Sequence, residues 1–472
     1  MLRAEAGGFS LRCIAGTFKF GPAFIFVLNQ WLILIYKTRK KHGGEIMKKI
    51  VTLLLAVCMI FAFTACSTAP SDTDAPSDAD APGDAEAPPA DAADSTVKIG
   101  VILVHDENTG YDFAHIQGIT AAAAAVGISE DQIIWKYNVS EDESCYDTAT
   151  DLVEQGCAYI FSDSYGHQSY MQQAASENPD VTFVAMTGDT AGISELPNLK
   201  NAFNDTYQSR YVSGVVAGMK LAELVADGKV ADSNMDSDGN ILIGYVGAYP
   251  YAEVVSGYTG FYLGVKSIVE NVAMTVSYTN SWYDPIAEAE AANALVSSGC
   301  IILSQHADST GAPSACEELL SAGTTVYCVG YNVDMLSVAP NAALTSAQNN
   351  WDVYYTYAFN CILNGEEIAT DWAEGYASGA VQISALGASC AEGTAEKVAE
   401  VQAALTDGSL NVFDCSTFTV EGAAVTSYLA IDTDGDWAGD TGEAIEDGIF
   451  HESTLRSAPY FGLRIDGITE LN

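Results

Sequence analysis

The stretch from Val97 to Val126, VKIGVILVHDENTGYDFAHIQGITAAAAAV, contains a strand, a loop and a helix in the order that a parallel sheet requires. Val97–Val104 is mostly apolar and rich in β-branched residues, which predicts a strand buried on both faces. Ala114–Val126 is dominated by alanine, the strongest helix former. A strand joined to a helix by a short polar loop is typical of βαβ units. The stretch therefore predicts an α/β fold.

This alternation of strand and helix occurs in two consecutive series. The first occupies residues 97–206 and the second residues 207–344, which begin with a long predicted helix. Two such series predict two Rossmann-like lobes, lobe 1 and lobe 2. Residues 345–472 are expected to return to lobe 1 through a helix at Trp351–Asn364 and then to make C-terminal crossings. The strands predicted after Val97–Val104 are Gln132–Val139, Ala158–Phe161, Val181–Met186, Ile241–Gly247, Ala273–Thr279, Cys300–Ser304 and Thr325–Gly330.

Loops that mix aromatic and polar side chains follow the predicted strands of both series. In open α/β sheets, ligands bind beyond the carboxyl ends of the strands. Flat rings beside directional hydrogen-bonding groups suit a flat heterocycle or a sugar ring. The sequence therefore predicts a ligand cleft. The candidate binding residues in and beside these loops are Asn108, Tyr111, Asp112, Ser164, Tyr165, Tyr249, Trp282, His306, Asp308, Asn332, Asp334 and Trp351.

The segment that begins at Met47, MKKIVTLLLAVCMIFAFTACS, has the parts of a secretory signal. Two lysines precede an apolar run of about 14 residues, which is too short for a permanent membrane span. A cysteine after a small residue resembles the bacterial lipobox, so residues 47–65 are predicted to be a lipoprotein signal peptide and Cys66 the lipidated residue. Residues 1–46 are interpreted as a mis-assigned N-terminal extension, with a transmembrane helix at Phe20–Tyr36 as the alternative.

The composition beyond this signal excludes one class of partner. Residues 66–96 form an acidic linker of Ala, Pro, Asp and other small residues after the cysteine, and this composition predicts disorder. Residues 66–472 hold 10 Lys and Arg against 60 Asp and Glu, so binding to a phosphate backbone is not expected and nucleic acid is excluded as a partner. Eight cysteines follow Cys66, most of them within apolar patterns. They are predicted to be buried thiols, with disulfides as the alternative.

From Val97 to the C-terminus the chain resembles the basic membrane lipoprotein (BMP) family of ABC-transporter substrate-binding proteins, which includes purine nucleoside receptors. The resemblance rests on the order and spacing of several stretches, among them DENTGYDFAHIQG, YQSRYVSGVVAGMKLAEL, IGYVGAYPYAEVVSGYTGFYLGVKS, VGYNVDM and LTSAQNNWDVYYTYAF. It implies a type I periplasmic-binding-protein fold with two lobes, a hinge and a ligand cleft between the lobes. It also implies a monomer outside the cytoplasm, anchored to the bacterial membrane through Cys66, that delivers a nucleoside or nucleobase to an ABC permease.

The resemblance also implies roles for particular residues. Tyr111 stands where the family typically has a Phe that stacks on the base. Asn332 stands at the position of an Asp that binds ribose hydroxyls, and Asn349 at that of a Lys. Both charges of that pair are therefore replaced by amides, which still donate and accept hydrogen bonds. His306 and Asp308 occupy a loop that is small and glycine-rich in the family, so they would narrow the pocket or contact the ligand.

Other interpretations remain open at this point. The same fold could bind a sugar, a flavin or a signalling molecule, or the protein could be an adhesin without a ligand. An enzyme would have to use His105, His167 and His306, but the chain contains none of the short catalytic motifs HExxH, HxxEH or GxSxG. We therefore expect no enzymatic activity and no cofactor.

One acidic segment has the ligand spacing of an EF-hand calcium loop. Trp437 stands where that loop requires glycine, and no flanking helix pair is evident. An acidic surface hairpin is the alternative. The candidate calcium ligands are Asp432, Asp434, Asp436, Asp440 and Glu443.

Overall fold

The computed structural model describes residues 2–5, 8–13, 16–20, 97–430 and 442–472. The chain divides into two compact units, residues 1–90 and residues 91–472. In the first unit, β1 (Leu2–Glu5), β2 (Gly8–Cys13) and β3 (Gly16–Phe20) form an antiparallel sheet. The predicted signal peptide, Cys66 and the linker lie outside the described residues. In the parts of the chain that the structure describes, no helix has the length and apolar character needed to cross a membrane.

Lobe 1 of the second unit is built on a six-stranded sheet in which every strand is parallel to its neighbours. Its first four strands in sequence alternate with helices, as the apolar runs predicted, whereas β8 (Leu199–Ala202) follows β7 (Thr182–Met186) without a helix between them. In β4, Ile99 pairs with Ile133 and Val101 with Phe161, which places buried apolar side chains at the centre of the sheet. The strand order is β14 (Asp371–Trp372), β8 (Leu199–Ala202), β7 (Thr182–Met186), β6 (Cys157–Ser162), β4 (Lys98–Ile102) and β5 (Ile133–Lys136).

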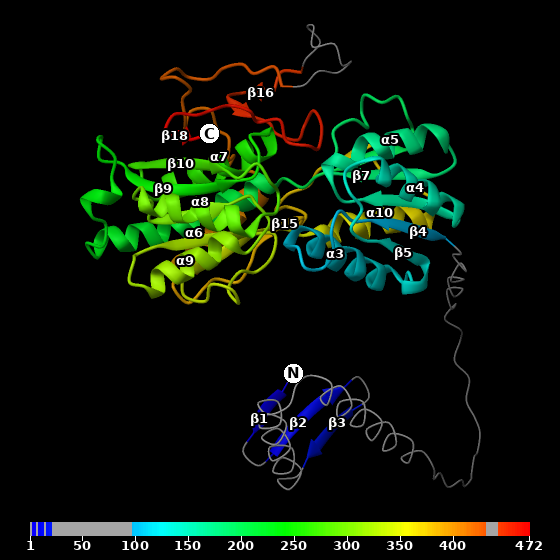
Figure 1. The fold of residues 1–472 in the computed structure, drawn as a ribbon, viewed down its shortest axis with the longest axis horizontal. Helices are drawn as coiled ribbons and strands as arrows, with labels where there is room; N and C mark the ends of the chain where they lie inside the picture. The colour runs from blue at the N-terminus through cyan, green and yellow to red at the C-terminus, as the bar shows by residue number, and fades with distance from the viewer. Residues whose placement is uncertain (1, 6–7, 14–15, 21–96, 431–441) are drawn as a thin grey trace, which may run out of the picture. The chain divides into compact units, whose positions relative to one another are not determined.

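Helices cover both faces of the lobe-1 sheet (Figure 1). α3 (Gly110–Val126) and α10 (Trp351–Asn364) pack on one face, and α4 (Glu143–Glu154) and α5 (Gln168–Glu177) on the other. α3 and α10 approach closely at Gly118, where a Cβ would lie 2.8 Å from the Cβ of Trp351. The predicted helix at Trp351–Asn364 is thus found with the predicted bounds, and it belongs to lobe 1.

Lobe 2 contains a seven-stranded sheet in which only β15 runs antiparallel. α6 (Thr206–Ala226) and α7 (Ala252–Lys266) cover one face, with α11 (Thr394–Thr406) packed against α6. α8 (Pro285–Ser297) and α9 (Gly311–Ser321) cover the other face. The strand order is β15 (Val381–Ile383), β13 (Ala343–Asn349), β12 (Tyr327–Tyr331), β11 (Ile302–Gln305), β9 (Ile241–Gly247), β10 (Val272–Tyr278) and β18 (Ile468–Glu470).

The chain crosses between the lobes three times, at residues 203–205, at residue 350 and at residues 373–380. The crossings are hydrogen-bonded to one another. Asp205 N–H donates to the carbonyl of Glu374 at 2.9 Å, and Asn350 N–H donates to the carbonyl of Ala380 at 2.8 Å. Three short connections held side by side form a hinge, around which two rigid lobes can open and close.

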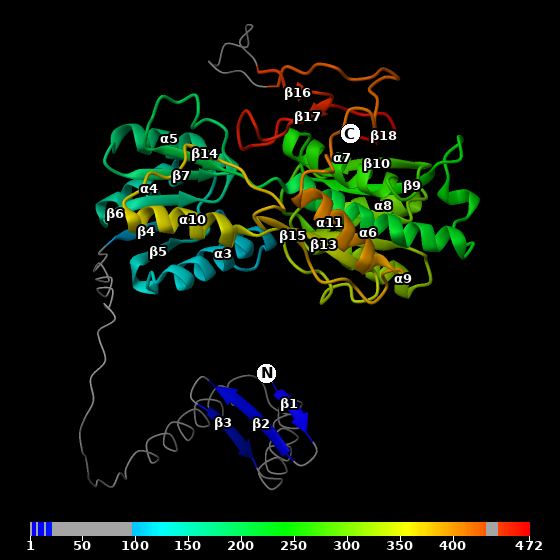
Figure 2. The ribbon, with the colours of Figure 1, turned by 180° about the vertical axis from the view of Figure 1, so that it is seen from behind.

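The C-terminal third differs in part from the expectation that it returns to lobe 1. β13 stays in the lobe-2 sheet up to Asn349, beyond the expected boundary at residue 344. From β15 onward the described chain packs mainly on lobe 2, where β16 (Ile445–Glu446) and β17 (Ile449–Phe450) form a hairpin and β18 extends the sheet (Figure 2). Phe413, Phe450 and Phe461 anchor this C-terminal segment in the lobe-2 core. This packing could not be predicted from the sequence, because short strands and isolated aromatic residues produce no periodic hydrophobic pattern.

The cysteines from Cys145 to Cys415 are free thiols in the described chain, and all but Cys390 are buried. Burial raises the pKa of Cys145 to about 12, so this thiol is inert at neutral pH. The prediction of buried thiols is confirmed, with the exception of Cys390, which is partly exposed.

Candidate ligand-binding site

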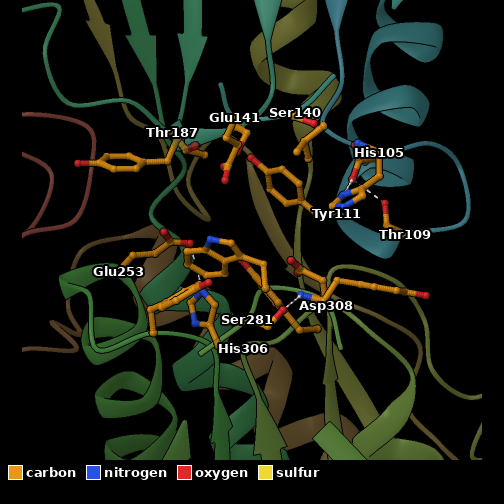
Figure 3. A pocket seen from close by; sticks show the side chains of 18 of the residues that line it. His105, Thr109, Tyr111, Ser140, Glu141, Thr187, Glu253, Ser281, His306 and Asp308 are labelled. Atoms are coloured by element: carbon orange, nitrogen blue, oxygen red, sulfur yellow. Dashed lines mark hydrogen bonds and ion pairs between the residues drawn. The ribbon is translucent and has the colours of Figure 1, made fainter. Parts of the chain in front are cut away.

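A cavity of about 500 Å³ lies between the two lobes, at the carboxyl ends of strands from both sheets. Its size is within the range of small-molecule sites. Figure 3 shows Tyr111 and Glu141 of lobe 1 on one side and Glu253, His306 and Asp308 of lobe 2 on the other. The lining residues are Val104, His105, Thr109, Tyr111, Asp112, Asn138, Ser140, Glu141, Ser164, Tyr165 and Thr187 in lobe 1, and Tyr249, Glu253, Ser281, Trp282, Tyr283, His306, Asp308 and Tyr331 in lobe 2.

Asp112 organises the loop between β4 and α3. One of its carboxylate oxygens accepts the backbone N–H of His105 at 2.7 Å, and the other accepts the hydroxyl of Thr109 at 2.5 Å. Burial opposes ionisation, but these hydrogen bonds outweigh it and lower the pKa of Asp112. The imidazole of His105 lies 3.6 Å from the same carboxylate, and this neighbour raises the pKa of His105. The loop is therefore held by hydrogen bonds to Asp112, and both oxygens of this carboxylate accept donors from the loop itself.

Tyr111 presents an oriented aromatic ring to the cavity. Its hydroxyl donates to the backbone carbonyl of Asp163, which holds the ring in place. The ring packs edge-on against His115, with centroids 4.8 Å apart, and His115 stacks on Trp351 at 4.4 Å. Burial lowers the pKa of His115 to about 3, so this support is a neutral, mostly apolar layer. The position of Tyr111 is thus set by packing from α3 and α10.

The rest of the lobe-1 wall comes from the loops after β5, β6 and β7. Glu141 accepts hydrogen bonds from the hydroxyl of Ser164 and the N–H of Gly166, both through the same oxygen. Asn138 and Thr187 have φ values of 57° and 60°, in the left-handed region that non-glycine residues rarely adopt. For a β-branched residue such as Thr187 this conformation is costly, and such strain is often found at binding sites.

Aromatic rings dominate the lobe-2 wall. Tyr249 stacks on Tyr251 with centroids 5.2 Å apart and an interplanar angle of 12°, and it meets Trp282 edge-on at 5.3 Å. His306 lies 4.8 Å from Tyr331, and the guanidinium of Arg210 lies 3.6 Å from the centroid of the Tyr331 ring. Clusters of this kind give flat apolar surfaces with little conformational freedom to lose when a ring stacks on them.

Two carboxylates lie among these lobe-2 rings. Glu253 pairs with His306 Nε2 at 3.1 Å, and Asp308 accepts a hydrogen bond from Asn332 Nδ2 at 2.6 Å. Burial, followed by the charge of Arg210, lowers the pKa of His306 to about 4, so the ring is neutral and donates to Glu253. Burial, followed by the charges of Glu288 and Glu253, raises the pKa of Asp308 well above its usual range.

The structure brings most of the candidate residues from the sequence together in the cavity lining. These are Tyr111, Asp112, Ser164, Tyr165, Tyr249, Trp282, His306 and Asp308. Sequence reasoning did not single out Val104, Thr109, Asn138, Ser140, Glu141, Thr187, Glu253, Ser281, Tyr283 and Tyr331, and it named His105 only for the enzyme alternative. Thr187 and Tyr331 each directly follow a predicted strand, so their positions alone could have identified them.

Five candidates do not line the cavity. Asn108 is exposed and donates to Asp106, and Asp334 is exposed and accepts the N–H of Leu336. Asn332 lies behind Asp308, and Trp351 is buried against His115. Asn349 lies at the hinge, where its Oδ1 accepts the hydroxyl of Thr206 at 2.8 Å and the side-chain amide of Asn204 at 3.3 Å.

The histidines considered for catalysis do not form one cluster. His105 and His306 line opposite walls, whereas His167 is fully buried and hydrogen-bonds to the carbonyl of Val139 at 2.9 Å. Among the described residues, no group of three His, Cys, Asp or Glu side chains is arranged to hold a metal ion. The candidate calcium ligands lie outside the described residues except Glu443, whose two oxygens accept hydrogen bonds from Ser427, Tyr428 and Ile445.

Two lobes, a three-segment hinge and an interlobe cavity are the features of a periplasmic binding protein. The family of PnrA-like ABC transporter substrate-binding proteins (Bmp) matches residues 105–408, more than half of the chain. The chain belongs to this family. Members of this family bind a solute outside the cytoplasm on behalf of an ABC transporter, so a small-molecule ligand and a permease partner are expected.

Individual relatives agree with the family. A purine-binding protein of Brucella abortus (strain 2308) is 29% identical over 275 residues, which cover 58% of this chain and 71% of that protein. A putative ABC transporter glucose-binding protein of Haloferax volcanii is 27% identical over 313 residues, 66% of this chain and 72% of that protein. The crystal structure of an ABC transporter solute-binding protein from Aeropyrum pernix K1 has a TM-score of 0.54 at 14% identity, covering 66% of this chain and 92% of that chain, and this likeness shows the fold alone.

Proposed function

We propose that this protein captures a purine base or nucleoside in the interlobe cavity and delivers it to an ABC import permease. The observation on which the proposal depends is the pair of aromatic walls. Tyr111 of lobe 1 and Trp282 with Tyr249 of lobe 2 line the same cavity, so a flat ring can stack between the lobes. Carboxylate and hydroxyl oxygens between these rings can accept hydrogen bonds from the N–H groups of a base.

The base, rather than the ribose, would supply most of the recognition. The resemblance to nucleoside receptors implies an Asp that binds ribose hydroxyls at position 332 and a Lys at position 349, and this chain has Asn332 and Asn349 instead. Neither amide lines the cavity, and the side chain of Asn349 is engaged by Thr206 and Asn204 at the hinge. A nucleobase therefore needs no group that the chain has lost, and a nucleoside would need other contacts for its sugar.

A sugar is the second candidate ligand. The putative glucose-binding relative from Haloferax volcanii favours it. Sugars also stack on aromatic rings and use carboxylates to accept hydrogen bonds from their hydroxyls. A flavin or a signalling molecule would use the same walls. The edge of a purine presents fewer donors than a hexose but a larger flat face, and the cavity has rings on both walls.

Delivery would follow closure of the lobes around the hinge. A ligand that contacts both walls stabilises the closed form, because only that form makes both sets of contacts. The permease would recognise the closed protein. Anchoring through a lipid on Cys66 and a linker over residues 66–96 would keep a monomer at the outer surface of the membrane. The protein would carry out no chemical step.

Thermal unfolding tests the proposal. The purified protein is first unfolded and refolded to remove any ligand retained from the cell, and is then heated with purine bases, purine nucleosides, glucose, other sugars and flavins. A ligand at 100 times its dissociation constant stabilises the fold by about 2.7 kcal/mol. The proposal predicts a higher midpoint with at least one purine. A shift with sugars or flavins alone would contradict it and would leave the solute-binding role intact.

A further inference from the structure

The cavity is strongly acidic. Four carboxylates line it, namely Asp112 and Glu141 in lobe 1 and Glu253 and Asp308 in lobe 2. Among the residues that the structure describes, no lysine or arginine lines it. The whole chain has a formal net charge of −43, so its field also favours the approach of cations.

Most of these carboxylates have an oxygen that accepts no hydrogen bond from the described chain. Within the described chain, hydrogen bonds reach both oxygens of Asp112 but only one oxygen each of Glu141, Glu253 and Asp308. In Asp308, burial and then the charges of the neighbouring acids raise the pKa well above its usual range, so this group ionises when a positive charge is brought beside it. The cavity thus contains acceptors without enough donors.

The nearby cation, Arg210, compensates these acids only in part, because its charge lowers the pKa of Asp308 less than burial and the neighbouring acids raise it. Arg210 is fully buried, stacks on Tyr331 and donates to the carbonyl of Gln305 at 2.6 Å. It is not among the residues that line the cavity. The two cavity histidines leave most of the acids uncompensated, because burial lowers the pKa of His306 to about 4, and His105, whose pKa is raised by Asp112, balances that one carboxylate.

Closure around a ligand would remove water from these carboxylates. Burying an ionised group is costly unless an opposite charge and hydrogen bonds replace its water. Aromatic faces attract cations as well, most strongly Trp. A neutral ring would only stack on the aromatic side chains. A cationic ring would stack on them and also compensate the negative charge of the carboxylates.

We propose that the cavity selects an aromatic heterocycle that carries a positive charge, with Trp282 and Tyr111 contacting its faces and Glu253 and Asp308 compensating its charge. The inference rests on the proposed function, since it concerns the ligand of the same cavity. It narrows the purine class to charged or ring-alkylated members, and it extends to other aromatic cations of similar size.

A matched pair of probes tests the charge separately from the purine ring. Guanosine is neutral, and N7-methylguanosine has nearly the same shape but a positively charged ring slightly below neutral pH. Titration calorimetry of the refolded protein with each probe gives the two dissociation constants. We expect N7-methylguanosine to bind at least about tenfold more tightly, a difference of 1.4 kcal/mol. Thiamine, an aromatic cation without a purine, is the third probe.

Each outcome separates the two proposals. Equal or tighter binding of guanosine overturns the charge inference and keeps the purine proposal. Binding of thiamine with neither purine nucleoside supports the charge inference, and the purine bases of the thermal panel then decide the purine proposal. Binding of none of the three by a protein with an intact unfolding transition overturns the charge inference, and the purine bases and neutral nucleosides of the thermal panel then decide the purine proposal.

Isosteric variants identify the residues responsible. Glu253→Gln and Asp308→Asn retain an oxygen that can accept from His306 and Asn332 but lose the charge. Each is expected to reduce the preference for N7-methylguanosine over guanosine by about tenfold. Glu290→Gln is the control, because Glu290 is exposed on α8 outside the cavity lining. An unchanged preference in both cavity variants would overturn the assignment.

Discussion

The two walls of the cavity use their polar groups differently. In lobe 1, Asp112 has both carboxylate oxygens occupied by its own loop, and Tyr111 has its hydroxyl bound to the carbonyl of Asp163. In lobe 2, Glu253 and Asp308 each have an oxygen without a protein donor in the described chain. Glu141 of lobe 1 is intermediate, since Ser164 and Gly166 share one of its oxygens.

This difference indicates that the two lobes have different roles in ligand binding. Groups that are already bonded within lobe 1 lose little freedom when a ligand arrives, so that wall is pre-organised. Groups with unused acceptors in lobe 2 are the ones that respond to the charge of a ligand. Lobe 1 would therefore position the ring, and lobe 2 would decide which ring is accepted.

The largest effect is expected at the aromatic surface of lobe 2. Trp282→Ala removes the largest ring of the cavity and should weaken ligand binding by about 2 kcal/mol or more, roughly 30-fold, as for other central aromatic contacts. Titration calorimetry with the tightest-binding ligand measures the loss. Trp282→Phe is the matched control and should retain most of the affinity. Equal affinities for Trp282→Ala and the unchanged protein would place the ligand elsewhere.

A pair of isosteric changes tests the contrast between the acids of the two walls. Asp112→Asn disturbs a carboxylate that satisfies two donors of the β4–α3 loop, so the free energy of unfolding should fall by about 1–3 kcal/mol. Glu253→Gln removes a charge that bonds only His306, so stability should change by less than about 0.5 kcal/mol. Denaturant unfolding of both variants without ligand measures the difference. If Glu253→Gln lowers the free energy of unfolding as much as Asp112→Asn does, the carboxylates of the two walls do not differ as described.

Glu452 is a buried acid in lobe 2 that lies outside the cavity lining. Burial raises the pKa of Glu452 to about 8, although Ser256 and the N–H groups of Tyr460 and Phe461 donate to it. Because the folded pKa is above the ordinary value of 4.5, the stabilisation is complete below about pH 4.5 and is lost as the pH rises from there through about 8. Glu452→Gln cannot ionise, so its unfolding midpoint should fall less over this pH range.

The exposed Glu446 provides the control for this pH effect, since Glu446→Gln should leave the pH dependence of the midpoint unchanged. The midpoint of each variant is measured by thermal unfolding at several pH values. A Glu452→Gln protein whose midpoint falls as steeply as that of the unchanged protein would show that Glu452 titrates normally.

The smallest effect is expected at a contact that joins the walls outside the cavity. Arg456 of the C-terminal segment lies 3.2 Å from Asp189 of lobe 1, and Asp189 also accepts the hydroxyl of Tyr165 at 3.3 Å. Both partners are partly exposed, so Arg456→Ala should cost about 0.2–1 kcal/mol of stability. Ligand affinity should stay within about twofold. A much larger loss of affinity would mean that this ion pair, rather than the ligand, holds the lobes together.

The sequence predicted the elements that are buried on both faces. Ile241–Gly247 and Trp351–Asn364 have the predicted bounds, because continuous apolar runs and helical spacing leave little choice. β13 was missed because it contains Thr345, Ser346 and Gln348, and its polar groups are satisfied by Ser384 and Asn332, which lie elsewhere in the chain. Such a strand has no apolar signal of its own.

The sequence predicted those residues of the candidate site whose positions follow from the strand ends alone. Tyr111, Trp282 and His306 follow strands, and strand ends converge in a parallel sheet. Asn349 was expected in the pocket, but its side chain lies at the hinge, since alignment with a family gives a position and not a direction. Glu253 was overlooked because one acid among 62 Asp and Glu carries no signal.

Equilibrium dialysis shows whether both walls hold one purine-class ligand. The refolded protein, Trp282→Ala and Tyr111→Ala are dialysed against the labelled purine that gives the largest rise in unfolding midpoint. We expect one bound ligand per chain for the unchanged protein and an affinity reduced by roughly tenfold or more in each variant. Unchanged, saturable binding in both variants, or displacement of the purine by glucose at equal concentration, would contradict it.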